Sequence, residues 1–165
     1  MPAFAATLRT LNEMKAEGVV EEYAIAGAMA LVFWAEPIPT YDLGVLVFLS
    51  DQKNPIVSLD AVYCWAAGRG YPADGEHLSI EGVPVQILPS PNELADEAIV
   101  TAATLAYDGV EVRVVKPEYL VALYSEPSAR TAKRRERAAA LLESGKVDRA
   151  LLQRVLERFG LEPPG

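Results

Sequence analysis

Residues 42–49 read Asp-Leu-Gly-Val-Leu-Val-Phe-Leu, an almost continuous apolar run behind a single acidic residue. An apolar run of this kind is typical of a strand that is buried on both faces at the centre of a sheet. We therefore expect residues 42–49 to form the central strand of the fold, with Asp42 at its start.

Segments with strand and helix patterns alternate on both sides of this run. Strands are expected at residues 19–25, 77–80, 83–88 and 110–115. Helices are expected at residues 4–15, 28–35, 58–69 and 92–104, and from about residues 117, 129 and 148. The dipeptide Glu81-Gly82, between two of the strands, favours a tight turn.

This order of elements predicts an α/β (α+β) fold in which a mixed sheet is flanked by helices. At 165 residues, of which 51% are hydrophobic, the chain is long enough to bury one sizeable core. We expect a single domain over residues 1–165, with the α/β core in residues 1–115 and a helical extension in residues 116–165.

The charge of the chain limits its partners. A net charge of −8 at pH 7 argues against a general nucleic-acid surface, because phosphate binding relies on clustered Lys and Arg. The basic residues are concentrated in one place, which we call the basic cluster: Arg130, Lys133, Arg134, Arg135 and Arg137. This cluster is either a solvated helix face or a contact for phosphate or an acidic partner.

Nothing in the sequence predicts export or membrane insertion. The longest apolar stretch, residues 23–35, is interrupted by Gly27 and falls short of the roughly 20 residues that span a bilayer. The first residues lack the basic segment of a secretory signal. A cytoplasmic protein without membrane contact is therefore expected.

Histidine and cysteine, the residues of nitrogen- and sulfur-ligated metal sites, each occur once. His77 is the only histidine, which excludes a multi-histidine metal site, and we expect it at the surface or at a strand edge. Cys64 is the only cysteine, and its apolar neighbours predict a packed, inert thiol inside a helix. Trp34 and Trp65 lie in apolar helical stretches and are expected in the core.

Two segments near the central strand form a motif. Residues 23–28 read Tyr-Ala-Ile-Ala-Gly-Ala, and residues 39–45 read Pro-Thr-Tyr-Asp-Leu-Gly-Val. Together they resemble the signature of the nucleotidyltransferase superfamily, which is an apolar residue, Gly, then Gly or Ser, a spacer, and an acidic–apolar–acidic triplet on a strand. The resemblance is strongest to the minimal nucleotidyltransferases and to the toxin-like members of type IV toxin–antitoxin systems. It extends more loosely through residues 82–89, 120–123 and 141–145.

The resemblance implies a nucleotidyltransferase-like fold and a site for a nucleoside triphosphate (NTP) held by Mg²⁺. Asp42 matches the first carboxylate of the triplet, which implies a catalytic metal ligand, and Gly27, Ala28 and Thr40 are implied to lie beside the phosphates. Two carboxylates at alternate strand positions face the same way and can share metal ions. A glycine turn ahead of a helix lets backbone N–H groups approach phosphate oxygens. We therefore expect Asp42 at the floor of a solvent-reachable cleft close to Gly27.

Three positions depart from the signature. Gly44 stands in place of the second carboxylate, and Gln86 stands where a third carboxylate is expected on a neighbouring strand. Ala28 stands in place of the small polar residue or glycine that follows the first Gly of the turn. Gly44 indicates either a lost carboxylate or close packing against another backbone. The acidic metal site is therefore predicted to be incomplete.

Three functions remain open. The first is an enzyme that transfers a nucleoside monophosphate from NTP to a protein, RNA or small acceptor, with Mg²⁺ as cofactor and Asp60 or Glu81 completing the site. The second is a catalytically inactive pseudoenzyme that binds a partner protein in a toxin–antitoxin-like pair and needs no cofactor. The third is a nucleotide-binding regulator that keeps the cleft and has lost the transfer step. The sequence leaves the acceptor, the base preference and the oligomeric state open.

Overall fold

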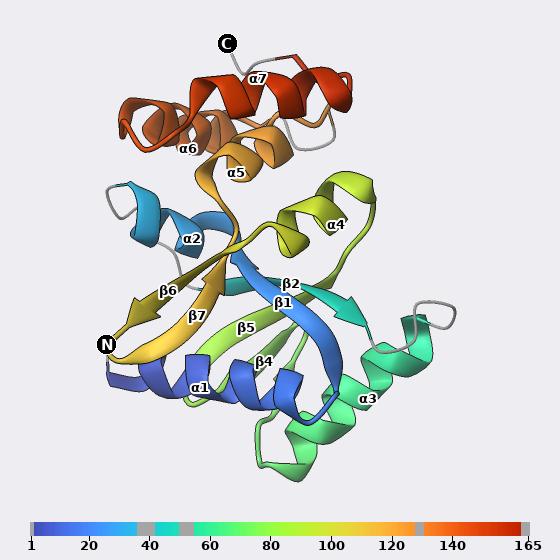
Figure 1. The fold of residues 1–165 in the computed structure, drawn as a ribbon. Helices are drawn as coiled ribbons and strands as arrows, with labels where there is room; N and C mark the ends of the chain where they lie inside the picture. Colours follow the sequence, from blue (N-terminus) through green and yellow to red (C-terminus); the bar gives the residue numbers. More distant parts are fainter. Residues whose placement is uncertain (1, 36–41, 50–54, 128–130, 163–165) are drawn as a thin grey trace.

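The computed structural model describes residues 2–35, 42–49, 55–127 and 131–162 (Figure 1). Within these ranges the helices are α1 (Pro2–Ala16), α2 (Gly27–Trp34), α3 (Pro55–Gly68), α4 (Glu93–Val100), α5 (Pro117–Tyr124), α6 (Ala132–Glu143) and α7 (Arg149–Arg158). The strands are β1 (Val20–Ala26), β2 (Leu43–Leu49), β3 (Ala73–Asp74), β4 (His77–Ile80), β5 (Val83–Pro89), β6 (Ala103–Tyr107) and β7 (Val110–Val114).

β2 lies at the centre of a mixed sheet. Among the described residues the strand order is β3-β4-β5-β2-β1-β7-β6, and β2 pairs antiparallel with β1 and parallel with β5. This arrangement confirms the central strand after Asp42 and the α/β class with a mixed sheet.

Alternate side chains of β2 point to opposite faces of the sheet. One set is at most 1% exposed and consists of Leu43, Val45, Val47 and Leu49. This set faces α1, because Val47 pairs with Tyr23, whose hydroxyl donates a hydrogen bond to Asn12 of α1. Asp42 and Gly44 alternate with the buried set and therefore face the other side. In Figure 1, α1 and α3 lie on one side of the sheet, and α2 and α4 lie on the other.

The three last helices pack on one another and on the sheet-flanking helices. α5 contacts α4, α6 and α7, and α6 contacts α2 (Figure 1). Tyr119 of α5 donates to Glu97 Oε2 of α4 at 2.7 Å, and Arg158 of α7 pairs with the same carboxylate. Buried side chains of α5, α6 and α7 belong to the same apolar cluster as those of α1 and β2. No described helix has the length and apolar character needed to cross a membrane.

Two hairpins have the left-handed turn residues that tight turns between twisted strands require. Glu81 (φ 53°) and Gly82 (φ 80°) join β4 to β5, which confirms the predicted turn. Asp108 (φ 49°) and Gly109 (φ 79°) join β6 to β7 in the same way.

The second hairpin corrects the prediction of a helix over residues 92–104. α4 begins after the Asn92 cap as expected, but it ends at Val100. Residues 103–107 form β6, which pairs antiparallel with β7. The Ala-rich sequence before Asp108-Gly109 has little strand character of its own, so strand pairing decided its structure.

α3 corrects three further predictions. The helix begins at Pro55, so Ser58 lies inside it and does not cap it; proline is favoured in the first turn of a helix. Cys64 is exposed, because Val62 and Ala66 occupy the buried face of the helix. Trp65 is half-buried rather than core, and its indole N–H donates to Glu17 Oε1 at 3.2 Å.

Trp34, at the end of α2, is also half-buried. Its indole N–H donates to the carbonyl oxygen of Val115 at 2.8 Å. The polar edge of the ring is therefore used to tie α2 to the segment that leads into α5, and the prediction of a fully buried side chain is wrong.

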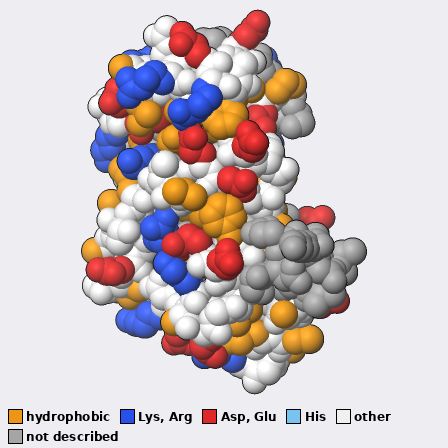
Figure 2. All heavy atoms as spheres, turned by 45° about the vertical axis from the view of Figure 1, so that its right-hand side comes forward, with side chains coloured by type: hydrophobic (Ala, Val, Ile, Leu, Met, Phe, Trp, Pro, Cys, Tyr) orange, Lys and Arg blue, Asp and Glu red, His pale blue; other side chains and the backbone are white. Residues whose placement is uncertain are grey.

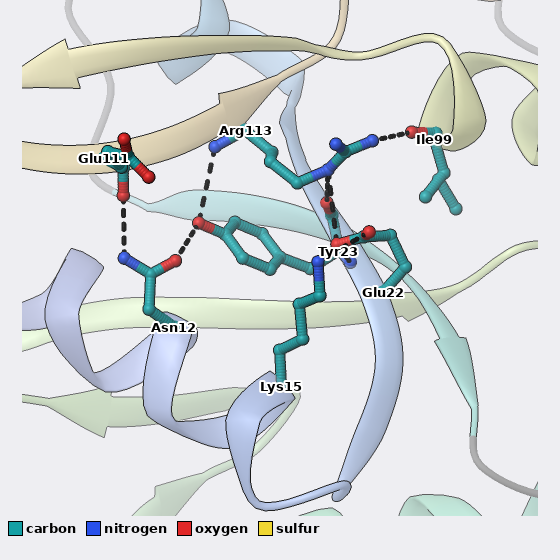
Figure 3. Close-up of polar contacts among 7 residues, drawn as sticks. All are labelled: Asn12, Lys15, Glu22, Tyr23, Ile99, Glu111 and Arg113. Atoms are coloured by element: carbon teal, nitrogen blue, oxygen red, sulfur yellow. Dashed lines mark hydrogen bonds and ion pairs between the residues drawn. The ribbon is translucent and has the colours of Figure 1, made fainter.

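A polar network centred on Tyr23 ties α1, β1, β7 and α4 together (Figure 3). The Tyr23 hydroxyl donates to Asn12 Oδ1 at 2.6 Å, and Asn12 Nδ2 donates to the carbonyl oxygen of Glu111 at 2.7 Å. The Arg113 guanidinium donates to the carbonyl oxygens of Tyr23 at 3.3 Å and Ile99 at 2.6 Å. The network therefore fixes how the edge hairpin and α1 lie against β1.

Tyr23→Phe is expected to lower the free energy of unfolding by about 1–2 kcal/mol near neutral pH, because Asn12 Oδ1 loses its donor. Urea denaturation followed by circular dichroism measures the change. The matched control is Tyr63→Phe, which removes a phenol hydroxyl outside this network and should change stability by less than about 0.5 kcal/mol. Equal stability of Tyr23→Phe and the unsubstituted protein would show that the hydroxyl contributes nothing.

Burial raises the pKa of the Tyr23 hydroxyl to about 12. The unfolded chain ionises tyrosine near pH 10. Stability from the neutral hydroxyl is therefore fully present below about pH 10 and is lost as the pH rises to about 12. We expect the unsubstituted protein to lose about 2–3 kcal/mol relative to Tyr23→Phe over this interval. A difference that stays constant when urea denaturation is repeated across the interval would contradict this expectation.

Candidate functional site

Backbone pairing brings the two halves of the sequence motif together. Ala26, the last residue of β1, pairs with Gly44 of β2, and Gly44 pairs with Gln86 of β5. Gly27 follows Ala26 directly and begins α2. The glycine turn, the start of β2 after Asp42, and the Gln86 position thus lie side by side across three neighbouring strands.

The start of α2 is suited to an anion. Gly27 has φ 64°, in the left-handed region where an L side chain is strained. Ala26 at the N-cap supplies no side-chain hydrogen bond to the first turn, so the backbone N–H groups there have no side-chain cap. Ala28, the second residue of the helix, is buried at 7% exposed. Thr40 lies outside the described residues.

Gly44 is not required by close packing. A Cβ built at this position would lie 3.7 Å from the carbonyl oxygen of Ala26 and 3.8 Å from Leu88 Cδ1, which are ordinary van der Waals distances. The close-packing explanation is therefore wrong. A Cβ atom can therefore be added at Gly44 without displacing the backbone beside it.

Asp42 contacts the single histidine of the chain. His77 Nε2 lies 3.1 Å from Asp42 Oδ2, and the two side chains are 34% and 42% exposed, respectively. The surface position predicted for His77 is confirmed, but its contact with Asp42 was missed. The available signal was the predicted hairpin over residues 77–88, which brings His77 to the neighbourhood of the central strand once β5 pairs with β2.

A cavity of about 360 Å³ opens beside this pair. It is lined by Asp42, Asp74, His77, Ser79 and Pro84. Asp42 therefore borders a solvent-reachable cavity, as the sequence predicts. Its distance from Gly27 stays a prediction.

The described residues do not form an acidic Mg²⁺ site. Such a site needs several oxygen ligands in near-octahedral geometry. Within the described ranges, no three His, Cys, Asp or Glu side chains converge closely enough to hold a metal ion. Gln86, which stands where the motif implies a third carboxylate, donates a hydrogen bond from Nε2 to Glu76 Oε2 at 3.2 Å.

The two other carboxylates considered for this site lie elsewhere. Glu81 is in the turn between β4 and β5, where it accepts a hydrogen bond from the Tyr71 hydroxyl at 2.8 Å. Asp60 lines a separate pocket next to Cys64 on α3. Neither side chain completes a metal site around Asp42.

Two solved structures resemble the chain over nearly its whole length. A crystal structure of an antigenic nucleotidyltransferase-like protein from Paracoccidioides brasiliensis has a TM-score of 0.57 and 13% sequence identity, over 96% of this chain and 88% of that chain. The solution structure of the antibiotic-resistance factor ANT(2'')-Ia has a TM-score of 0.55 and 13% identity, over 94% of this chain and 90% of that chain. The fold is that of the nucleotidyltransferases. Neither family models nor curated proteins match the sequence.

These likenesses confirm the fold that the motif predicts. At this level of identity they concern the fold alone, and function depends on the residues of the site. The strand pairing places Gly44 beside Gln86, the two residues that the sequence motif aligns with its second and third acidic positions.

The basic cluster lies at the start of α6. The side chains of Lys133, Arg134 and Arg135 are exposed, and Arg137 is half-buried. Burial raises the pKa of Tyr124 at the end of α5, and the guanidinium groups of Arg137 and Arg134 oppose that shift. Within the described residues, neither Tyr124 Oη nor Arg137 Nε has a partner with hydrogen-bond geometry. Three of the five cluster members therefore form a solvated face, and Arg130 lies outside the described residues.

Gly27→Ala is expected to lower the free energy of unfolding by about 1–2 kcal/mol, because alanine is strained at φ 64°. Gly68→Ala is the matched control, since Gly68 lies at the end of α3, where an added Cβ would meet open space and φ is not positive. That control should be neutral or stabilising by up to about 1 kcal/mol. Equal urea midpoints for the two variants would show that the turn does not depend on glycine.

Proposed function

We propose that this chain is a nucleotidyltransferase-fold protein that binds a nucleotide beside Gly27 and Asp42 and transfers little or no nucleoside monophosphate from NTP. One observation carries the proposal. Gly44 and Gln86 are paired residues on adjacent strands, at the positions where the fold's signature calls for carboxylates. Of the three acidic positions, Asp42 alone keeps a carboxylate.

The start of α2 supports nucleotide binding. Its backbone N–H groups have no side-chain cap, and Gly27 lets the chain turn tightly ahead of them. Helix amino ends attract phosphate through these N–H groups and through the helix dipole. The cavity beside Asp42 provides room next to the same strand ends.

The loss of carboxylates argues against efficient transfer. Transfer of a nucleoside monophosphate depends on positioning and on neutralising the charge of the phosphates, which metal ions normally supply. Mg²⁺ keeps several waters and relies on one or two carboxylates together with substrate phosphates, so a lone carboxylate holds it weakly. Nucleotide binding can therefore persist where a two-metal arrangement cannot form.

A binding role in a pair of the toxin–antitoxin kind is the second candidate. The exposed side chains of Lys133, Arg134 and Arg135 favour it, because a concentrated basic surface on a chain of net charge −8 suits an acidic protein segment. Figure 2 shows one face of the molecule, on which acidic and basic side chains are interspersed.

Gly44→Asp is expected to increase Mg²⁺-dependent incorporation of labelled nucleotide by about tenfold or more over the unsubstituted protein, because it restores the second carboxylate. A Cβ at this position meets only van der Waals contacts, so the variant should fold. Gly44→Asn is the matched control, since it adds nearly the same volume without the charge. The assay compares the proteins with the same acceptor preparation and each of the four NTPs.

Efficient incorporation by the unsubstituted protein, abolished by Asp42→Ala, would overturn the proposal of a reduced site. Binding is measured separately by isothermal titration calorimetry with the same NTPs. If none binds the unsubstituted protein, the nucleotide-binding proposal fails and the protein-partner candidate takes its place.

A further inference from the structure

We infer that the His77 imidazole takes the place of a divalent cation beside Asp42, so that this site is built to bind its ligand without a metal. The identity of the ligand rests on the proposed nucleotide binding. The exclusion of the metal rests on the arrangement of Asp42 and His77 and can be tested without any nucleotide.

The His77 contact engages one of the two carboxylate oxygens of Asp42. His77 Nε2 lies 3.1 Å from Asp42 Oδ2, within hydrogen-bonding distance. A Mg²⁺ ion bound to that oxygen would lie about 2.1 Å from it and would need its own shell of oxygen ligands. The imidazole therefore competes with the ion for the lone pairs of Asp42 Oδ2, and removing the ring should make this oxygen a better ligand.

Strand pairing holds His77 in this position. The neighbouring Leu78 is 1% exposed and pairs with Val85, which anchors β4 against β5. Because side chains alternate along a strand, His77 points to the opposite face, which is the face of Gln86 and Gly44. The contact with Asp42 follows from the register of the sheet.

The side chains around the cavity are consistent with this contact. Among the described residues that line it, His77 alone carries a side-chain nitrogen, whereas Asp42 and Asp74 are carboxylates, and the backbones of Asp74 and His77 pair across β3 and β4. Glu76 nearby accepts a hydrogen bond from the Gln86 amide. The carboxylates of Asp42 and Glu76 thus face side-chain nitrogens of His77 and Gln86, respectively.

Two features on different strands therefore weaken metal binding. Gly44 removes one ligand, and His77 engages another. Restoring the carboxylate at Gly44 alone should recover only part of the metal affinity, because the remaining ligand is still held by the imidazole. The two positions should be coupled, which a double-mutant cycle measures.

The experiment measures Mn²⁺ binding, as an Mg²⁺-like probe detected by electron paramagnetic resonance. It compares four proteins: the unsubstituted chain, Gly44→Asp, His77→Val, and the Gly44→Asp, His77→Val double variant. We expect the double variant to bind at least about tenfold more tightly than Gly44→Asp, and by more than the product of the two single effects. Gly44→Asn combined with His77→Val is the control for the added volume and should not gain affinity.

Valine suits a strand, and thermal unfolding checks that each variant is folded. His77→Thr replaces it if the valine variant does not fold. Equal Mn²⁺ affinity of Gly44→Asp and the double variant would overturn the inference, as would tight binding by the unsubstituted protein or no binding by the double variant.

A second arm measures ATP binding to the unsubstituted protein with EDTA and with Mg²⁺. Equal affinity supports a metal-free site, and a loss of tenfold or more in EDTA overturns it. Absence of ATP binding under both conditions would count against the proposed nucleotide-binding function and would leave the Mn²⁺ cycle as the deciding test of the role of His77.

Discussion

The two-residue period of β2 is the constraint on which the rest of the structure depends. Leu43, Val45, Val47 and Leu49 must all face α1 to bury the core, and they are almost fully buried there. Asp42 and Gly44 alternate with them and are therefore placed on the opposite face. A shift of one residue would turn this set away from α1 and turn Asp42 toward it, so the packing against α1 also fixes the direction of the candidate site.

The strand pairing then determines which residues of the neighbouring strands lie beside the start of β2. β1 places Ala26 opposite Gly44, so the Gly27 turn and α2 begin beside the start of β2. β5 places Gln86 on the other side, and β4 follows with His77 on the same face. The Tyr23 network holds the far side of the sheet to α1 and α4 through hydrogen bonds to Asn12 and Arg113. The core packed against α1 and the candidate site thus lie on opposite faces of the same sheet.

The fold is that of the nucleotidyltransferases, and the candidate site proposed within it is poor in carboxylates. Gly27 has the left-handed backbone conformation that glycine allows, and Asp42 directly precedes the central strand. Gly44 and Gln86, which pair on adjacent strands of the same face, are neutral. His77 adds a nitrogen donor or acceptor beside the remaining carboxylate, so the local chemistry is that of a hydrogen-bonding site.

The sequence by itself determined the elements whose signals are local. The apolar run after Asp42, the helical face of residues 4–15, the Glu81-Gly82 turn and the Asn92 cap each specify structure through neighbours a few residues apart. The motif around Gly27 and Asp42 also predicted the fold. The tertiary structure alone decided that residues 103–107 form β6, that Cys64 is exposed, that Tyr23 joins α1 to β7, and that His77 meets Asp42. These features depend on which strands pair and which helix face is covered, and the periodicity of a single segment carries no information about its distant partner.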